Sequence, residues 1–169
     1  MEGKDSALEA LASCIEYPSV DFVYQLERAA EIVERQDREA ARLIGRFRGF
    51  IESMPVGAVE ALHAQIFDME PACCLYVGYH VFGDTHRRGI FLAGLSEWYG
   101  RSGFSADGEL PDYLPVLLRF LSRAEEGPEK SELIQYCMIP AIESIGRGVS
   151  DKKSPYGDLI TAIRLLVSR

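Results

Sequence analysis

The sequence has no long apolar run, and its N-terminus is neither basic nor apolar. The longest stretch without Asp, Glu, Lys or Arg extends from Pro71 to Gly83, which is shorter than the roughly 20 residues that a membrane-spanning helix needs. The first residues include Glu2 and Asp5, whereas a secretory signal begins with basic and then apolar residues. These absences predict a cytoplasmic protein that does not insert into a membrane.

Cysteine is scarce as well, with four residues in a chain of 169: Cys14, Cys73, Cys74 and Cys137. A chain of this length buries a core of its own and does not depend on disulfides. Cys73 and Cys74 are adjacent, and neighbouring residues cannot bond to each other without strain. We therefore expect four reduced thiols, and any further role of Cys73 and Cys74 stays open.

Positive charge is in the minority. Lys and Arg total 18 and Asp and Glu total 26, so the formal net charge is −8 and the isoelectric point lies near 4.9. A surface of this sign repels phosphate backbones and removes the main driving force of non-specific nucleic-acid binding. We expect no nucleic-acid partner, and a basic partner would be the complementary one.

The motifs of common catalytic sites are missing too. The sequence contains no GxxxxGK[ST] phosphate loop, no GxSxG motif and no HExxH motif, each of which carries a specific chemistry. A metal site can be drawn from His80, Asp84 and His86, with Cys73 and Cys74 nearby, because ligands four residues apart share a helix face. Gly83 lies between the first two ligands and breaks that helix. The residues therefore give no support to catalysis by these familiar routes, and we expect no metal and no cofactor.

Helical periodicity, in contrast, is present along nearly the whole chain. Apolar residues recur at spacings of three and four, as on the buried face of a helix, and His63 lies on one such stripe as an expected core histidine. No internal repeat or flexible linker interrupts the pattern. The prediction is an all-α fold, a single domain over residues 1–169 formed by a bundle of about eight helices. Its last stripe comprises Leu159, Ile160, Ile163, Leu166 and Val167.

Four local features follow from the same pattern. Ser19 is expected to cap the second helix, and Phe50 belongs to an apolar stripe and should face the interior. The segment Leu75–Phe82 has the composition of a strand, but a single strand among helices has no partner, so we interpret it as a buried helix. Pro140 should kink the helix that contains it.

The segment Gly83–Gly89 departs from this simple pattern. Asp84 precedes a predicted helix, where its carboxylate can accept backbone N–H groups, and Arg88 follows one turn later. The segment is therefore either an ordinary helix cap with solvated arginines or a fixed network between Asp84 and Arg88 that shapes a groove. The residues alone leave both interpretations open.

The segment Gly108–Pro115 is the second departure. Pro111 is suited to the start of a helix, while Glu109 and Asp112 concentrate negative charge beside apolar residues. These carboxylates are either loop and capping residues or the acidic rim of a groove for a basic amphipathic peptide.

Together, these two segments resemble the NarJ-type family of molybdenum-cofactor assembly chaperones, the delta subunits of respiratory nitrate reductase, within the TorD-like redox-enzyme maturation group. The clear similarity covers residues 62–122, and Ile66-Phe67-Asp68 and Pro155-Tyr156 fit the family more loosely. The residues that carry it are Leu75-Tyr76-Val77, His80-Val81, Gly83-Asp84-Thr85, Arg88-Gly89 and Glu109 to Pro115.

The resemblance implies a TorD-like chaperone and not an enzyme. Such a protein binds the N-terminal segment of the apo catalytic subunit of a nitrate reductase in the cytoplasm. Such a chaperone assists insertion of the molybdenum cofactor, and molybdenum-cofactor biosynthesis proteins are further candidate partners. Members of the wider group occur as a monomer or a homodimer. The peptide-binding residues implied by the motif are Tyr76, His80, Asp84, Arg88, Glu109, Pro111, Asp112 and Tyr113.

In this interpretation Asp84 and Arg88 fix the helix junction, and Glu109 and Asp112 attract basic residues of the client. His63, His86 and Arg119 replace residues usual in the family, so a dimethyl sulfoxide, chlorate or selenate reductase stays open as the client. A stable structural or adaptor subunit of such a complex is the other alternative. The apolar floor of the groove would come from Leu75, Tyr76, Tyr79, Leu114 and Leu118.

Overall fold

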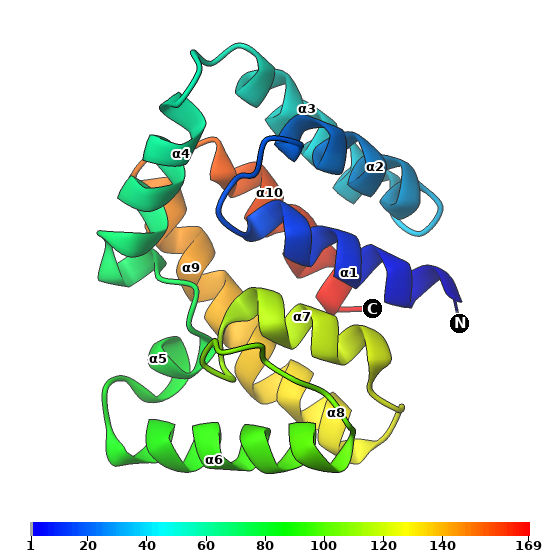
Figure 1. Cartoon of the computed structure of the whole chain (residues 1–169), viewed down its shortest axis with the longest axis vertical. Helices are drawn as coiled ribbons and strands as arrows, with labels where there is room; N and C mark the ends of the chain where they lie inside the picture. Colours follow the sequence, from blue (N-terminus) through cyan, green and yellow to red (C-terminus); the bar gives the residue numbers. More distant parts are fainter. Residues whose placement is uncertain (1) are drawn as a thin grey trace.

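Helices account for the apolar periodicity in the computed structural model, which describes the backbone of residues 2–169 and the side chains from Ala7 onward (Figure 1). Within these residues the chain is an all-helical single domain of nine helices, eight of them with seven or more residues. The predicted fold class is therefore confirmed. The helical segments are α1 (Glu2–Ile15), α2 (Phe22–Glu34), α3 (Arg38–Glu52), α4 (Ala58–His63), α5 (Val77–Phe82), α6 (His86–Arg101), α7 (Leu114–Arg123), α8 (Pro128–Glu132), α9 (Ile139–Asp151) and α10 (Tyr156–Val167).

Two of these segments belong to one continuous helix. The π-helical stretch Leu133–Met138 joins α8 to α9, and Pro140 lies in the first turn of α9. A proline in a helix removes one N–H and crowds the preceding turn, and the wider π turn is one of the known ways in which a helix accommodates such an interruption. The disturbance predicted at Pro140 therefore appears as a π segment that ends at Met138, two residues before the proline.

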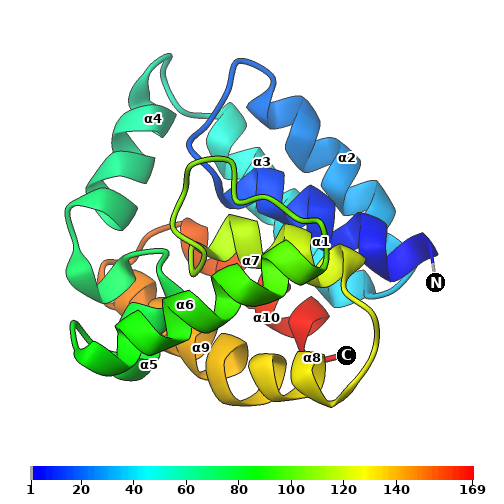
Figure 2. The ribbon, with the colours of Figure 1, turned by 60° about the horizontal axis from the view of Figure 1, so that its bottom comes forward.

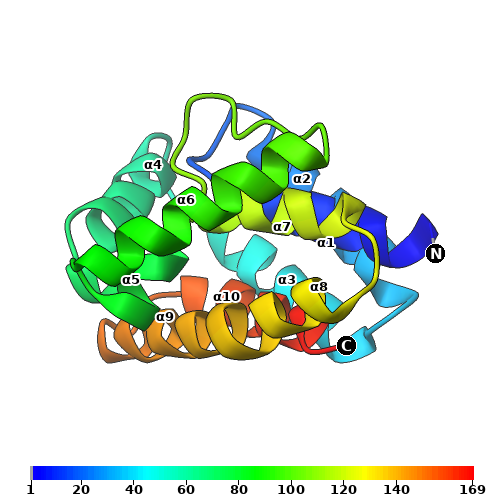
Figure 3. The same ribbon diagram turned by 90° about the horizontal axis from the view of Figure 1, so that it is seen from below.

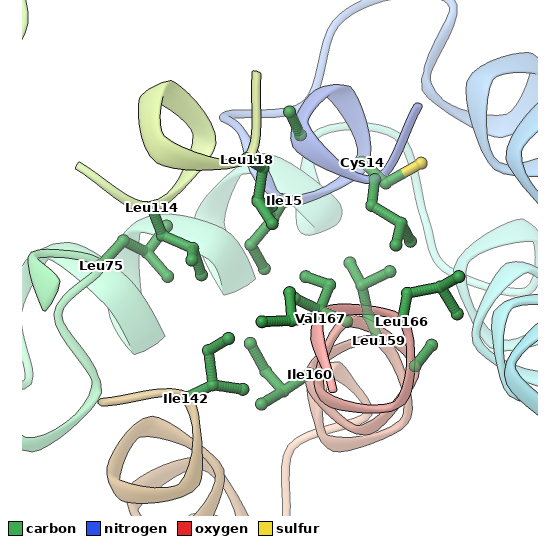
Figure 4. Packing of buried hydrophobic residues seen from close by; sticks show 14 of the residues in the cluster. Cys14, Ile15, Leu75, Leu114, Leu118, Ile142, Leu159, Ile160, Leu166 and Val167 are labelled. Carbon is green, nitrogen blue, oxygen red and sulfur yellow. The ribbon is translucent and has the colours of Figure 1, made fainter. Parts of the chain in front are cut away.

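Helix α10 forms the centre of the core. Helices α1, α3 and α9 pack against it, and Figure 4 shows its side chains converging with those of α1, α7 and α9. Every residue of the predicted last stripe, Leu159 to Val167, is at most 2% exposed. Because each buried aliphatic side chain contributes about 1.5–3 kcal/mol, this helix is a main source of the stability of the fold.

The structure corrects two of the local expectations. Ser19 does not cap α2: Asp21 occupies that position without a side-chain cap, and the Ser19 hydroxyl accepts hydrogen bonds from Asp21 N–H and the Gln25 side chain. Phe50 does not face the interior but is 48% exposed. Its neighbours Phe47 and Ile51 are buried, so they fill the core on this turn of α3.

Helix α6 lies across the outside of the bundle next to α5, as seen from two directions (Figures 2 and 3). A loop leads from its end back to the start of α7. All four cysteines are free thiols. Among residues 2–169, no helix combines the length and the apolar character required to cross a bilayer.

Candidate functional site

The two segments of the sequence motif meet in a short backbone pairing. Tyr76 and Tyr113 form an isolated antiparallel β-bridge. The N–H of Leu114 donates to the Leu75 carbonyl at 2.7 Å, and the N–H of Val77 donates to the Asp112 carbonyl at 2.8 Å. The segment Leu75–Phe82 is therefore not helical throughout. Its first two residues pair with the segment Glu109–Pro115 (ELPDYLP), and α5 begins only at Val77.

Asp112 is the centre of this junction. Its carboxylate is fully buried and accepts the Gly78 N–H at 3.1 Å. It also accepts two hydrogen bonds from the Arg88 guanidinium, from Nε at 3.0 Å and from Nη2 at 3.2 Å. Paired, two-point contacts of this kind are among the strong hydrogen bonds of proteins, and they join α5, α6 and the turn before α7.

This arrangement corrects two expectations. Asp112 is not part of an exposed acidic rim, because it lies in the interior and its charge is matched by Arg88. Arg88 forms its ion pair with Asp112 and not with Asp84, which is exposed. Thr85, the N-cap residue of α6, has no side-chain cap bond and donates its hydroxyl to the Phe82 carbonyl.

At Gly78 the helices α5 and α6 and the turn before α7 approach so closely that a side chain has no room. A Cβ atom at this position would lie 2.7 Å from Asp112 Oδ2 and 2.9 Å from Phe91 Cδ1. Contacts this short are excluded by van der Waals repulsion. The absence of a side chain therefore allows the first turn of α5 to reach the buried carboxylate.

A pair of tyrosine rings covers the junction. Tyr76 and Tyr113 are half-buried, with ring centroids 5.4 Å apart, and the Arg88 guanidinium carbon lies 5.6 Å from the centre of the Tyr76 ring. Burial raises the pKa of Tyr76, and the nearby carboxylates of Glu109, Asp112 and Asp68 raise it further. Two exposed carboxylates, Glu109 and Asp68, therefore lie near this aromatic surface.

Pro111 does not start a helix, because α7 begins at Leu114 and Pro115 provides the proline of its first turn. The carbonyl of Pro111 instead accepts the hydroxyl of Tyr99, a residue of α6, at 2.7 Å. This bond fixes the turn that delivers Asp112 into the interior.

His80 lies on α5 where this helix contacts α9. Its Nε2 donates to the Cys74 carbonyl at 2.7 Å, because a carbonyl only accepts, and its Nδ1 accepts from the Ser144 hydroxyl at 3.0 Å. Burial lowers the pKa of His80, while the bond to the Cys74 carbonyl opposes this effect. Both ring nitrogens of the neutral side chain are thus occupied, and no cluster of three metal-ligating side chains occurs among the described residues.

The expected apolar floor is only partly accessible. Leu75, Leu114 and Leu118 are at most 2% exposed and contribute to the core in Figure 4, whereas Tyr76 and Tyr79 are half-buried. These leucines stabilise the junction from below and are not available to a ligand in this conformation.

The structure thus divides the eight motif residues into groups. Tyr76, Arg88, Asp112 and Tyr113 form one contact network, and Pro111 supports it through Tyr99. The other three do not join this network: His80 bonds to α9, and Asp84 and Glu109 are exposed.

Sequence reasoning missed several residues of this site: Asp68, Gly78 and Tyr99. Gly78 is part of the LYVGYH stretch, where a glycine within an apolar helix start is a signal of close approach. Asp68 belongs to the Ile66-Phe67-Asp68 element that fits the family loosely, but the element does not indicate a site residue. No signal marks Tyr99, because the folding of distant segments brings it here.

The fold is shared with a known class of proteins. The crystal structure of an Archaeoglobus fulgidus protein described as a redox enzyme maturation protein superimposes with a TM-score of 0.66, covering 98% of this chain and 94% of that one at 20% sequence identity. At this identity the similarity establishes the all-helical fold of that class and nothing more.

The chain belongs to the nitrate reductase delta subunit family, whose sequence profile matches residues 29–138. It is 30% identical over 156 residues to a Bacillus subtilis protein named as a probable nitrate reductase molybdenum cofactor assembly chaperone, NarJ, covering 89% of this chain and 82% of that protein. It is 25% identical over 157 residues to the Escherichia coli K12 protein NarW, also named as a probable chaperone of this kind, covering 92% of this chain and 65% of that protein. This is a family of chaperones and not of enzymes.

Proposed function

We propose that this protein is a maturation chaperone that binds the N-terminal segment of the apo catalytic subunit of a nitrate reductase in the cytoplasm and assists insertion of the molybdenum cofactor. The observation that carries this proposal is the similarity to the Bacillus subtilis chaperone along 89% of the chain. A related molybdoenzyme remains the alternative client.

The surface around Tyr76 and Tyr113 has the chemistry that such a client segment requires. Two half-buried aromatic rings offer apolar contact, and Leu110, in the adjoining turn, is 45% exposed. The carboxylates of Glu109 and Asp68 act on both tyrosines. A basic amphipathic peptide would place apolar residues on the rings and its Lys or Arg side chains beside the carboxylates.

The buried network beneath this surface has a supporting role in the proposal. Asp112 and Arg88 hold the tyrosine pair in position through the backbone bridge and the contact of Arg88 with the Tyr76 ring. A surface that is already ordered loses less conformational entropy on binding. Asp112 and Arg88 therefore act as positioning residues, and Glu109 and Asp68 as the groups that face the client.

The test is a titration of the N-terminal peptide of the nitrate reductase catalytic subunit from the same organism. We expect micromolar or tighter affinity, about −8 kcal/mol or stronger, and a loss of about tenfold or more when Glu109→Lys is combined with Asp68→Lys. The matched control combines Glu125→Lys with Glu132→Lys, which reverses two exposed charges away from the tyrosines. Equal weakening by both pairs would remove Glu109 and Asp68 from the site, and no binding by the wild type would reject the peptide proposal.

Purification of the mature reductase separates a chaperone from a permanent adaptor subunit. A chaperone is absent from the finished enzyme, so its stoichiometric presence there would favour the adaptor.

A further inference from the structure

A cavity of about 1100 Å³ lies between α3, α9 and α10, and it contains none of the residues of the tyrosine surface. Its walls are tied together by two arginine–carboxylate pairs. Arg46 of α3 binds Asp158 of α10, and Arg164 of α10 binds Glu143 of α9 with two donors. The walls are set by the packing of α3 and α9 against α10, which these exposed bridges supplement, so the cavity is present without a ligand.

The cavity collects positive charge that is not neutralised. Among the described residues, the Arg and Lys side chains that have no ion pair within 4 Å are Arg35, Arg38, Arg87, Arg147 and Lys153. Two of these, Arg147 and Lys153, line this one cavity. The lining carboxylates, Glu143 and Asp158, are each already paired with an arginine. The local excess is thus positive in a protein whose net charge is −8.

The lining also supplies neutral hydrogen-bonding groups and a free aromatic ring. Ser150, Ser154 and Thr161 contribute hydroxyls. Phe50, which periodicity predicts to be buried, lies 48% exposed at this cavity. Gly146 and Gly157 also line the cavity.

We propose that this cavity binds a small phosphorylated compound with a planar aromatic ring, of the nucleotide type. The phosphate would lie between Arg147 and Lys153, which are the two cations free to receive it, with the serine hydroxyls as further donors. The ring would stack on Phe50. A pocket that combines apolar surface with a few placed polar groups is the usual form of a small-molecule site.

The test is calorimetric titration of the full chain with AMP, GMP and flavin mononucleotide, and with pyrophosphate as a probe that has no ring. We expect at least one nucleotide to bind with a Kd below about 1 mM. Arg147→Gln combined with Lys153→Gln should weaken it about tenfold or more. The matched control, Arg35→Gln with Arg38→Gln, also removes two unpaired cations but outside the cavity, and should leave the affinity unchanged.

The Phe50→Ala variant distinguishes recognition of the aromatic ring of the compound from recognition of its phosphate. It should weaken the nucleotide and leave pyrophosphate binding as it was, and because Phe50 is half exposed the variant should fold. The proposal is overturned if no nucleotide binds, if the Arg35/Arg38 control weakens binding as much as the Arg147/Lys153 variant, or if Phe50→Ala has no effect on the nucleotide. Binding of hexaglutamate through Arg147 and Lys153 in place of the nucleotides would also overturn it and assign the cavity to an acidic peptide.

Discussion

Asp112 and Arg88 form a two-point ion pair between residues that are 24 positions apart in the chain. The carboxylate is fully buried and the arginine side chain is 18% exposed, so the pair is largely shielded from water. It joins the outer helix α6 to the turn that precedes α7, and α5 is bound to the same carboxylate through the Gly78 N–H. The most specific part of the sequence motif therefore encodes a structural joint beneath the proposed client surface.

Removal of the buried carboxylate should destabilise the fold strongly. Asp112→Ala leaves the Arg88 guanidinium and the Gly78 N–H without their acceptor, and breaking a buried ion pair costs about 3–5 kcal/mol. We expect a loss near 3 kcal/mol in the free energy of unfolding from urea titration, because Arg88 can still reach some solvent. Glu109→Ala, at an exposed carboxylate of the same segment, should change the free energy of unfolding by less than about 0.5 kcal/mol. Equal effects of the two variants would contradict the structural role of Asp112.

Two glycines provide a matched test of close packing. Gly78→Ala would bring a methyl group to within 2.7 Å of Asp112 Oδ2 and should lower the free energy of unfolding by about 1–3 kcal/mol. Gly94 lies within α6 with nothing within 4 Å of a Cβ, so Gly94→Ala should raise stability by about 0.5–1 kcal/mol through helix propensity. Urea titration of both variants measures the difference. Stabilisation by both substitutions would show that the junction can widen without cost.

The helices could be predicted from the sequence because burial on one face leaves a repeating apolar pattern, as in the stripe from Leu159 to Val167. The environment of Asp112 could not, since its two partners lie in other segments and a carboxylate before a helix looks the same whether it is buried or solvated. Phe50 shows a second limit: periodicity identifies the apolar side of a helix but not which of its residues reach the core. The composition of Leu75 and Tyr76 did indicate extended backbone, yet their partner, the ELPDYLP segment, becomes visible only in the fold.

The cysteines should react in an order set by burial. Burial raises the pKa of Cys14 to about 12, and Cys14 and Cys73 are fully buried, so neither offers an accessible thiolate. Cys74 and Cys137 are only half-buried and should be alkylated first by iodoacetamide in the native protein. Peptide mapping by mass spectrometry after timed labelling, with a urea-unfolded sample as the control, gives the order. Native labelling of Cys73 as fast as Cys74 would mean that the turn at Pro71–Cys73 opens in solution.

Acidification should destabilise the protein through His63 and His80, whose pKa values are lowered by burial. His63 is 2% exposed, its Nε2 donates to the Ile15 carbonyl at 3.0 Å, and its Nδ1 has no partner among the described residues. Burial lowers the pKa of His63 below its ordinary value of 6.5, which the bond to Ile15 partly opposes. A proton added to Nδ1 would create a buried charge without an acceptor.

The direction in which stability changes with pH follows from the difference in proton binding between the folded and the unfolded state. Below about pH 6.5 the unfolded chain binds the proton and folded His63 does not. The contribution of neutral His63 to the free energy of unfolding is therefore fully present above this pH. It is lost as the pH decreases toward the pKa of the folded state. The limiting slope is about 1.4 kcal/mol per pH unit for each such histidine, and His80, whose pKa burial also lowers, contributes in the same direction.

Urea titrations at several pH values between 5.5 and 7.5 measure this slope in the wild type and in two variants. His63→Phe keeps a ring against Phe67 and Tyr156, which lie 4.9 and 5.8 Å from the imidazole, but it carries no titrating group. Its free energy of unfolding at neutral pH should be lower by about 1–3 kcal/mol, because the Ile15 carbonyl loses its donor. Its free energy of unfolding should also depend less on pH than that of the wild type. His86→Gln, at an exposed histidine, should retain the wild-type slope. If His63→Phe keeps the full slope, the acid sensitivity comes from other groups and His63 is not its source.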